Sequence, residues 1–389
     1  MISRSETLAS LREQTFDLLV IGGGATGAGI ALDAATRGLR TALIEKEDIA
    51  FGTSSRSTKL IHGGLRYLKQ FEIQLVREVG LERAIVHRNA PHLVIPEKML
   101  LPLIRGGQYG KVMTAIGLTV YDLLARVAKP DRRRMLGKEA TLEKEPLLDA
   151  SRIKGGGYYA EYRTDDARLT IALIRTAIEA SACCANYVSA ESFEKADDQV
   201  TGVIARDALA EETFSIRAKQ VVNATGPWVD QLREKDGSRS GKGLHLTKGV
   251  HLVVAHDRLP IQQSIYFDVP DGRMIFAIPR GHITYIGTTD TTYDEDISHP
   301  KTSKADATYL LDAVNAFFPE VTLTLADIQS TWAGLRPLIH EDGKSPSELS
   351  RKDEIFESPD GLISIAGGKL TGYRKMAERV VDRVINRSH

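Results

Sequence analysis

The segment from Phe16 to Lys46, FDLLVIGGGATGAGIALDAATRGLRTALIEK, restricts the fold more than any other part of the chain. An apolar, strand-forming run is followed at once by Gly22, Gly24 and Gly27, which open a helix predicted to end near Thr36. Glycines at this spacing permit a tight turn, a close approach of the backbone to a pyrophosphate, and close packing of helix on strand. The free N–H groups of the helix then face the phosphates. The segment therefore predicts a binding site for an adenine dinucleotide.

A second predicted strand, Thr41–Ile44, ends at Glu45. A carboxylate at this point accepts hydrogen bonds from an adenosine ribose, whereas a basic residue would suit a 2′-phosphate. Glu45 therefore argues against NADP. A glycine pattern alone is a weak signal, but here it occurs with the strand before it, the helix after it and the acidic strand end.

The charge balance argues against whole-molecule attraction to nucleic acid or to an acidic membrane. Lysine plus arginine and aspartate plus glutamate each number 51, so an anion-binding site would have to be local. The length of 389 residues and a hydrophobic content of 42% are sufficient for two domains. The only cysteines, Cys183 and Cys184, are adjacent, which suits neither a structural disulfide nor a metal site. A reducing compartment and no metal are expected.

Two stretches bear on membrane contact. Residues 1–15 lack the apolar core of a signal peptide, and no run reaches the roughly 18 apolar residues of a spanning helix. The nearest approach, Val112–Tyr121, is predicted to be a buried helix, with a surface that dips into a bilayer as the alternative. The basic cluster Lys129–Arg134 is predicted to be a solvated turn, with contact to lipid phosphates as the alternative.

The segment Phe51–Leu68, FGTSSRSTKLIHGGLRYL, is rich in small hydrogen-bond donors. Their hydroxyls can bond a pyrophosphate or a ribityl chain, and they belong to Ser54, Ser55, Ser57 and Thr58. The turn His62-Gly63-Gly64 lets the backbone approach a flat ring. Composition alone favours a solvated serine loop instead. The position of the segment directly after the nucleotide unit favours the functional interpretation.

The rest of the chain alternates predicted helices and strands. Helices are predicted at 71–89, 167–181, 303–317 and from 366 to about 385, the second capped by Asp165-Asp166. Strands are predicted at 97–104, 155–162, 186–191, 200–207, 212–216, 221–226, 352–357 and 362–365, with a separate sheet region within 246–287. The turn that ends VVNATG (221–226) can lie against the dinucleotide, and AGGKLT (366–371) presents further free N–H groups.

These glycine-containing segments, far apart in sequence, are expected to share one nucleotide domain. NAD dehydrogenases usually keep their dinucleotide unit continuous, whereas flavoproteins close over FAD with late segments. The predicted fold is α/β (α+β), a Rossmann-type FAD-binding domain of the glutathione-reductase and D-amino-acid-oxidase kind with an inserted antiparallel-sheet substrate domain. The predicted boundaries are 1–90, 151–235 and 340–389 for the FAD-binding domain, and 91–150 and 236–339 for the substrate-binding domain.

Eight motifs occur in a recognisable order: DLLVIGGGATGAGIALDAATRGL, TSSRSTKLIHGGLRYL, DDARL, VVNATGPWVD, KGVHLVV, IGTTD, GLRPL and GGKLTGYRK. Together they resemble the FAD-dependent sn-glycerol-3-phosphate dehydrogenases and oxidases of the aerobic type, over nearly the whole chain. The most selective motif is SSRSTKLIHGGLRYL. Members of that family carry a further C-terminal helical domain, which is not expected here because the sequence ends at His389, shortly after the final helix.

The resemblance implies two sets of site residues. FAD would be surrounded by Gly22, Gly24, Gly27, Glu45, Ser54, Ser55, His62, Gly63, Val188, Gly226, Gly368, Lys369, Leu370 and Thr371. The substrate pocket would be lined by Arg66, Tyr67, His251, Arg336, Arg351 and Lys369. The FAD is expected to be non-covalent, because Cys183 and Cys184 fall beside a strand that should face the adenine rather than the flavin ring.

The implied chemistry assigns roles within these sets. A phosphate dianion needs bidentate donors, which Arg66 with Arg351 or Arg336 would supply. Oxidation of an alcohol needs a base for the hydroxyl proton, and His62 is the first choice and His251 the second, unless either is only structural. Arg336 would lie over the developing oxyanion.

The implied reaction is the oxidation of sn-glycerol 3-phosphate to dihydroxyacetone phosphate, with electrons passed to a quinone or another acceptor. The implied location is cytoplasmic, and contact with the inner face of the cell membrane and a homodimer are left open. One alternative is an FAD-dependent oxidase or dehydrogenase of a 2-hydroxy acid or an amino acid. Another is a non-catalytic flavin-binding subunit, against which the joint presence of His62, Arg66, Arg336 and Lys369 argues.

Overall fold

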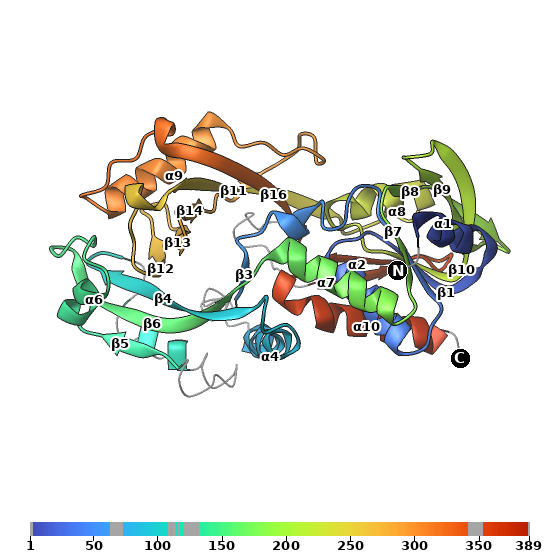
Figure 1. Ribbon diagram of the computed structural model, residues 1–389, viewed down its shortest axis with the longest axis horizontal. Coiled ribbons are helices and arrows are strands. Elements are labelled where there is room, and N and C mark those ends of the chain that lie inside the picture. Colours follow the sequence, from blue (N-terminus) through green and yellow to red (C-terminus); the bar gives the residue numbers. More distant parts are fainter. Residues whose placement is uncertain are drawn as a thin grey trace.

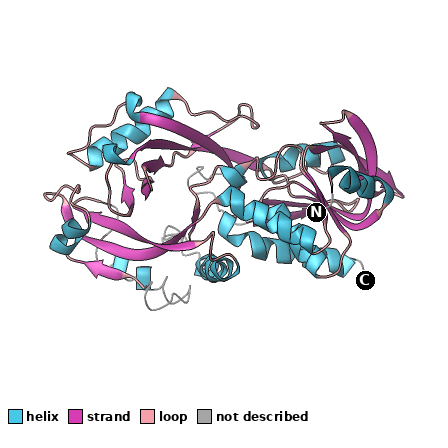
Figure 2. Ribbon diagram, viewed as in Figure 1, coloured by secondary structure: helices cyan, strands magenta, loops and turns pink. Residues whose placement is uncertain are grey.

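The computed structural model describes residues 3–62, 73–107, 110, 114–115, 117–119, 132–340 and 353–387. Its strands form two sheets that lie beside each other along the long axis of the molecule (Figure 1). Helices gather mainly over one half, and long strands dominate the other (Figure 2). Both chain ends lie in the helix-rich half.

The first sheet is built on the predicted nucleotide unit. Its strand order is β17-β18-β10-β1-β2-β7, and β8 and β9 extend it through β10. The neighbours of β1 and the pairs β2–β7 and β10–β18 are parallel. The bounds are β1 Thr15–Ile21, β2 Thr41–Ile44, β7 Cys183–Ala185, β8 Val188–Ala196, β9 Gln199–Asp207, β10 Glu212–Asn223, β17 Asp353–Glu357 and β18 Ile363–Gly367.

Strand β1 is buried on both faces because helices cover one side and a meander the other. Leu18 and Val20 pack in a core with helices α2 (Ala25–Thr36), α7 (Asp166–Glu179) and α10 (Tyr373–Arg387). Leu19 and Ile21 pack in the opposite core, against the β8–β9 meander. Burial on both faces explains why this strand reads as a continuous apolar run.

Strand β10 differs from the sequence prediction, which divided it into two strands. Its first half pairs with β9 in antiparallel fashion, and from Arg217 it also pairs with β1 in parallel. The largely polar run Arg217–Gln220 interrupts the apolar pattern, but its backbone is still paired with β1. The pairing of β10 changes from β9 to β1 near Arg217, and in the sequence this change resembles a boundary between two separate strands.

Helix α1, Arg4–Glu13, was not predicted, because its residues are polar and show no helical apolar period. It begins with a capping box in which Ser3 and Glu6 bond each other's backbone N–H. Leu11 is fully buried, and Arg4 forms an ion pair of 2.7 Å with Asp207. Tertiary contacts thus stabilise a helix that the local sequence favours only weakly.

The second sheet has the order β15-β11-β14-β13-β12-β4-β6-β3, with β16 paired to β11 and β5 to β6. All its pairs except β4–β12 are antiparallel. Helix α9 (Lys304–Phe317) packs on one face. The bounds are β3 Leu60–Ile61, β4 Ile95–Ile104, β5 Arg134–Leu136, β6 Ile153–Arg163, β11 Leu244–Ala255, β12 Ser264–Asp268, β13 Met274–Arg280, β14 Ile283–Gly287, β15 Thr291–Thr292 and β16 Ile328–Ile339.

Three further helices lie in the described chain: α4 Ile73–Asn89, α6 Lys138–Lys144 and α8 Val229–Asp236. Helix α4 connects the two halves through ion pairs. Glu82 accepts two hydrogen bonds from Arg374 of α10, at 2.7 and 2.8 Å, and Arg83 donates to Glu161 of β6 at 3.0 Å. The position of α4 is therefore fixed from both sheets.

The membrane alternatives fall largely outside the described residues. Of the predicted helix Val112–Tyr121, the structure describes Thr114 and Leu118 as buried, and of the basic cluster 129–134 it describes residues 132–134 alone. None of the helices within the described ranges is both long enough and apolar enough to cross a bilayer. The division into two domains remains a prediction, with β3 and β6 belonging to the second sheet.

The turn between β1 and α2 leads to a stability prediction. A Cβ added to Gly27 would lie 1.9 Å from the carbonyl oxygen of Gly22, so β1 and α2 would have to separate. We expect Gly27→Ala to lower the free energy of unfolding by about 1–3 kcal/mol, measured by denaturant titration.

The matched control is Gly137→Ala at the N-terminus of α6. The nearest atom to an added Cβ there is Glu139 Oε2 at 3.9 Å, and we expect a change below about 1 kcal/mol. Equal effects of the two substitutions would contradict the close-packing account of Gly27.

Candidate functional site

A cleft of about 420 Å³ lies where the two sheets meet. Its walls come from the turn after β1, the segment 52–62, the start of β8, the turn 224–228, strand β16 and the segment 367–371. The predicted site residues among its lining are Gly22, Gly24, Glu45, Ser54, His62, Val188, Gly226, His251, Arg336, Gly368, Lys369, Leu370 and Thr371. Segments distant in sequence thus converge on one cleft.

Parallel pairing explains this convergence. Strands β1, β10 and β18 are neighbours that run in the same direction, so their carboxyl ends reach the same edge of the sheet. The glycine turn follows β1, the 224–228 turn follows β10, and the 367–371 segment follows β18. Ligands of open parallel sheets bind at this edge.

The first glycine turn is held in a conformation that only glycine adopts readily. Gly22 has φ +116°, and a Cβ there would lie 2.6 Å from the carbonyl oxygen of Ala224. Ser54 Oγ accepts a hydrogen bond of 2.9 Å from the backbone N–H of Ala25 at the start of α2. The start of the helix and the serine segment are therefore in contact.

Glu45 supports this turn in a way that sequence reasoning did not anticipate. Its carboxylate accepts hydrogen bonds from the backbone N–H groups of Gly23 at 2.6 Å and Glu47 at 3.0 Å. Burial raises the pKa of Glu45, against the opposing effect of these two donors. Each carboxylate oxygen has a second lone pair, so the group can still accept from a ribose hydroxyl.

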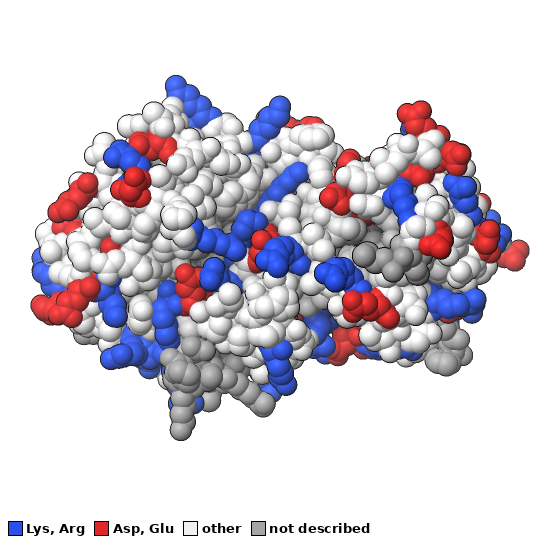
Figure 3. Space-filling view, in the orientation of Figure 1, with Lys and Arg blue, Asp and Glu red and all other residues white. Residues whose placement is uncertain are grey.

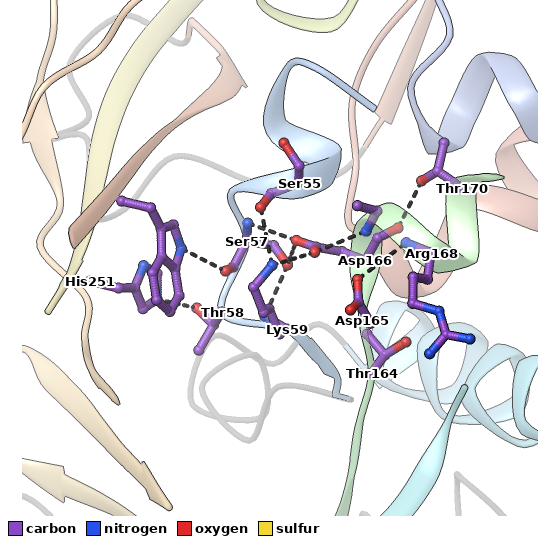
Figure 4. A network of polar contacts seen from close by, with 12 residues as sticks. Ser55, Ser57, Thr58, Lys59, Thr164, Asp165, Asp166, Arg168, Thr170 and His251 are labelled. Atoms are coloured by element: carbon purple, nitrogen blue, oxygen red, sulfur yellow. Dashed lines mark hydrogen bonds and ion pairs between the residues drawn. The ribbon is translucent and has the colours of Figure 1, made fainter. Parts of the chain in front are cut away.

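The serine segment is not a solvated loop. Thr53 Oγ1 donates to the carbonyl of Leu335 at 2.7 Å, and Ser57 Oγ donates to Asp166 at 2.6 Å. Ser55 directs its hydroxyl to the carbonyls of Phe51 and Gly52. Figure 4 shows that Ser57, Thr58 and Lys59 lie between Asp166 and His251. Ser57 and Thr58 therefore bond protein groups, and Ser54 is the hydroxyl at the helix start.

His62 and Lys369 meet in the cleft. His62 Nε2 lies 3.5 Å from Lys369 Nζ, and the carbonyl of His62 accepts a hydrogen bond of 3.3 Å from Thr371 Oγ1. The imidazole also lies edge-on to Phe276 of the second sheet, with ring centroids 6.0 Å apart. Strand β3 and the glycine turn after β18 thus place the predicted base beside a cation.

His251 is almost fully buried on β11. Its ring stacks on Trp332 with centroids 4.6 Å apart, and Nε2 lies 3.0 Å from Thr58 Oγ1. Burial, reinforced by the positive charges of Arg336 and Lys59, holds the pKa of His251 well below its usual range. The imidazole is therefore neutral near pH 7.

Arg336 projects from β16 into the same cleft and is fixed by three acceptors. It donates to Thr288 Oγ1 at 2.9 Å, and to the carbonyl of Thr289 and the carboxylate of Asp290, both at 3.1 Å. A guanidinium held in this way is already oriented before any ligand arrives.

Four predicted site residues, Gly63, Arg66, Tyr67 and Arg351, lie outside the described residues. Gly27 contributes to the site indirectly, because it lets α2 pack closely against Gly22 at the end of β1.

Besides Lys235 of α8, sequence reasoning missed two cations of the cleft lining that pack on aromatic rings. Lys46 Nζ lies 4.1 Å from the ring centroid of Trp228, and Arg56 Cζ lies 4.7 Å from that of Phe51. The Phe51 and Trp228 rings are 6.4 Å apart, so both cations belong to one aromatic pair. Burial lowers the pKa of each cation. Their positions in the sequence could have identified them, because Lys46 follows Glu45 directly and Arg56 lies within the serine segment.

The surface is consistent with a local anion site on a chain of zero net charge. Figure 3 shows both signs of charge on this face, with lysine and arginine concentrated where the two halves meet. Within the described ranges, no group of three or more histidine, cysteine, aspartate or glutamate side chains is arranged to hold a metal ion. Cys183 and Cys184 lie on β7, and burial raises their pKa values to about 11 and about 12.

Comparison with known proteins identifies the class. The model of the family described as "FAD dependent oxidoreductase" matches residues 17–373, so the chain belongs to this family. Among its relatives is the aerobic glycerol-3-phosphate dehydrogenase of Bacillus subtilis (strain 168), which is 56% identical over 386 residues, 99% of this chain and 70% of the relative. The enzyme of the same name from Staphylococcus aureus (strain USA300) is 57% identical, over 99% of this chain and 69% of the relative.

A solved structure agrees with this assignment. The glycerol-3-phosphate dehydrogenase from Bacillus halodurans, complexed with FAD, superimposes with a TM-score of 0.83 at 51% identity, covering 99% of this chain and 67% of that one. Glycine oxidase from Geobacillus kaustophilus shares the fold, with a TM-score of 0.70 at 21% identity. The predicted fold class and the predicted cofactor, FAD, are confirmed.

The described residues of the cleft fit FAD. Glu45 and Lys46 stand at the carboxyl end of β2, where an adenosine binds in this fold, and the glycine turn at the start of α2 lines the same cleft together with Ser54. Lys46 and Arg56 are half-buried cations that line the cleft, as the diphosphate requires. His62, Lys369 and Arg336 stand among the segments that would meet the flavin ring.

The buried His251 leads to a pH prediction. Because its pKa in the folded protein lies well below the ordinary value of about 6.5, below that pH the unfolded chain binds a proton that the folded chain does not. The free energy of unfolding therefore falls as the pH falls below about 6.5, by up to about 1.4 kcal/mol per pH unit from this one group.

The variant His251→Phe keeps an aromatic ring against Trp332 and removes the proton. We expect its curve of unfolding free energy against pH, measured by urea titration from pH 5 to pH 7, to be flatter than that of the wild type by up to this slope. The other histidines contribute equally to both proteins. Parallel curves would show that His251 does not contribute.

Proposed function

We propose that the chain oxidises sn-glycerol 3-phosphate to dihydroxyacetone phosphate with FAD, and that its electrons pass to a quinone. The observation that carries the proposal is one cleft that joins a dinucleotide-binding turn to His62, His251, Arg336 and Lys369. It occurs in a chain 56% identical to an aerobic glycerol-3-phosphate dehydrogenase. The site roles below, the FAD contacts given by the sequence and the two-domain division are parts of this proposal.

The chain must remove one proton from the substrate hydroxyl. When bound, FAD accepts the hydride that leaves the alcohol carbon. His62 is the proposed base, because it stands at the carboxyl edge of the first sheet among the residues that would meet the ring. His251 is the second choice, and its low pKa keeps the imidazole in the neutral form that can accept a proton.

Arg336 and Lys369 supply positive charge to the bound anion. Arg336 is held by Thr288, Thr289 and Asp290, so its charge needs no reorganisation when negative charge develops on the substrate oxygen. Lys369 lies beside His62 and can contribute to phosphate binding. Arg66, Tyr67 and Arg351, from the part of the chain that is not described, complete the proposed phosphate site.

The reaction makes a direct spectroscopic prediction. Under anaerobic conditions, sn-glycerol 3-phosphate should bleach the absorbance of the bound flavin, because the substrate transfers two electrons to it. Glycerol, which lacks the phosphate, should bleach it far more slowly at the same concentration.

The same measurement with lactate and glycine tests the alternative substrates, a 2-hydroxy acid and an amino acid. Unchanged absorbance with glycerol 3-phosphate, in a protein that contains FAD and is bleached by dithionite, would exclude this substrate. Unchanged absorbance with all compounds would favour a non-catalytic flavin-binding subunit.

Removal of the oriented charge tests the role of Arg336. We expect Arg336→Met to lower the rate constant of flavin reduction at saturating substrate by about 100- to 1000-fold, since stabilisation of a developing oxyanion is lost. The control is Arg258→Met, an equivalent change at an exposed arginine, which should leave the rate within about twofold. Similar rates for the two variants would remove Arg336 from the mechanism.

The proposal also covers the electron acceptor, contact with the membrane and the oligomeric state. Re-oxidation of the bleached flavin by a soluble quinone should be faster than re-oxidation by dissolved oxygen. Co-sedimentation with lipid vesicles tests contact with the membrane, and analytical ultracentrifugation tests a homodimer.

A further inference from the structure

Asp166, in the DDARL motif, is a buried carboxylate to which the mechanism above assigns no role. It is the first residue of α7 and is fully buried. It accepts hydrogen bonds from the N–H of Ser57 at 3.0 Å, the hydroxyl of Ser57 at 2.6 Å, Lys59 Nζ at 2.6 Å and the N–H of Ala167 at 3.0 Å. A buried charge is costly unless it is fully paired, and this one is paired almost entirely with a single three-residue segment.

That segment, 57–59, contacts both His251 and the Trp332 ring on which His251 stacks. Thr58 Oγ1 lies 3.0 Å from Nε2 of His251, and the carbonyl of Ser57 accepts a hydrogen bond of 3.1 Å from the indole of Trp332, on which His251 stacks. The carbonyl of Thr58 also accepts a hydrogen bond of 3.1 Å from Tyr285. Figure 4 shows this series of contacts from Asp166 through Ser57 and Thr58 to His251.

The two ring nitrogens of His251 are not equivalent. Nε2 faces Thr58, whereas Nδ1 is buried and has no hydrogen-bond partner within the described part of the chain. A buried N–H donor without a partner is rarer than an acceptor without one. The nearby positive charges of Arg336 and Lys59 also favour an unprotonated Nδ1, because positive charge attracts a lone pair and repels an N–H dipole. These considerations put the proton on Nε2, where it is donated to Thr58, and leave the lone pair on Nδ1.

We propose that Asp166 is a positioning residue: by fixing segment 57–59 it holds Thr58 against Nε2 of His251, and so fixes the tautomer of His251 with its lone pair on Nδ1. The consequence for turnover rests on the proposed function, but the tautomer of His251 does not. The same segment begins beside Ser54 and Ser55, so one carboxylate also links the cofactor side of the cleft to its substrate side.

Nitrogen-15 NMR of the holoenzyme with labelled histidines tests the tautomer without any turnover. The His251 signals are identified by their absence in His251→Phe. In the wild type, Nε2 should be protonated and Nδ1 should not. In Thr58→Val the Nε2 proton loses its acceptor, so the Nδ1-protonated form should appear, and Thr58→Ser should restore the original signals. A wild-type His251 protonated on Nδ1 would overturn the proposal.

Stopped-flow reduction of the flavin by glycerol 3-phosphate tests the consequence for the reaction. Thr58→Val and Asp166→Asn should each lower the rate constant at saturating substrate by about 10- to 100-fold, with the half-saturating concentration within about threefold. Thr58→Ser should stay within about threefold of the wild type. The double variant Thr58→Val/Asp166→Asn should be no slower than the slower single variant, because both changes act through His251.

The control is Asp165→Ala, which removes the N-cap of the same helix and none of the bonds to segment 57–59. It should lower the melting temperature and leave the reduction rate unchanged. Multiplicative losses in the double variant, or wild-type rates in Thr58→Val, would refute positioning by Asp166. If the wild-type flavin is not reduced at all, the proposed substrate is wrong, and the NMR measurement still decides the inference.

Discussion

The shape of the cleft depends on close contacts between backbone segments at the carboxyl edge of the first sheet. Gly22 lies against the carbonyl of Ala224, and Gly27 lies against the carbonyl of Gly22, so β1, α2 and the turn after β10 approach more closely than any side chain allows. This proximity aligns the start of α2 with the turns that follow β10 and β18. The shape of the dinucleotide site is thus set by the backbone. The side chains of Glu45, Ser54 and Lys46 lie around this backbone framework.

The second sheet contributes through its edge nearest this framework. Strands β11 and β16 carry His251 and Arg336, whose surroundings are opposite in kind. His251 is enclosed by aromatic rings and one hydroxyl, and its burial keeps it neutral, while Arg336 is enclosed by oxygen acceptors, which keep it oriented. An uncharged imidazole and a fixed cation thus line one cleft.

The sequence was sufficient for the parts of the fold that are determined locally. The run 16–46 predicted β1, α2 and β2 closely, because burial on both faces and glycine spacing leave few alternatives. It was not sufficient where a partner distant in sequence decides. The helix α1, the undivided strand β10, and the bonds of Ser57 and Thr58 all depend on contacts with residues far along the chain. The partner of Thr58, for example, could not be identified until β11 was placed beside the serine segment.

The topology of the first sheet also has a consequence for synthesis on the ribosome. Strand β1 is among the first segments to emerge, but its neighbour β10 emerges only after β3 to β9 have been made, and β18 and α10 follow later still. Until then the apolar edge of β1 has no permanent partner on that side. The newly made chain must therefore keep an aggregation-prone strand protected until β10 has been made.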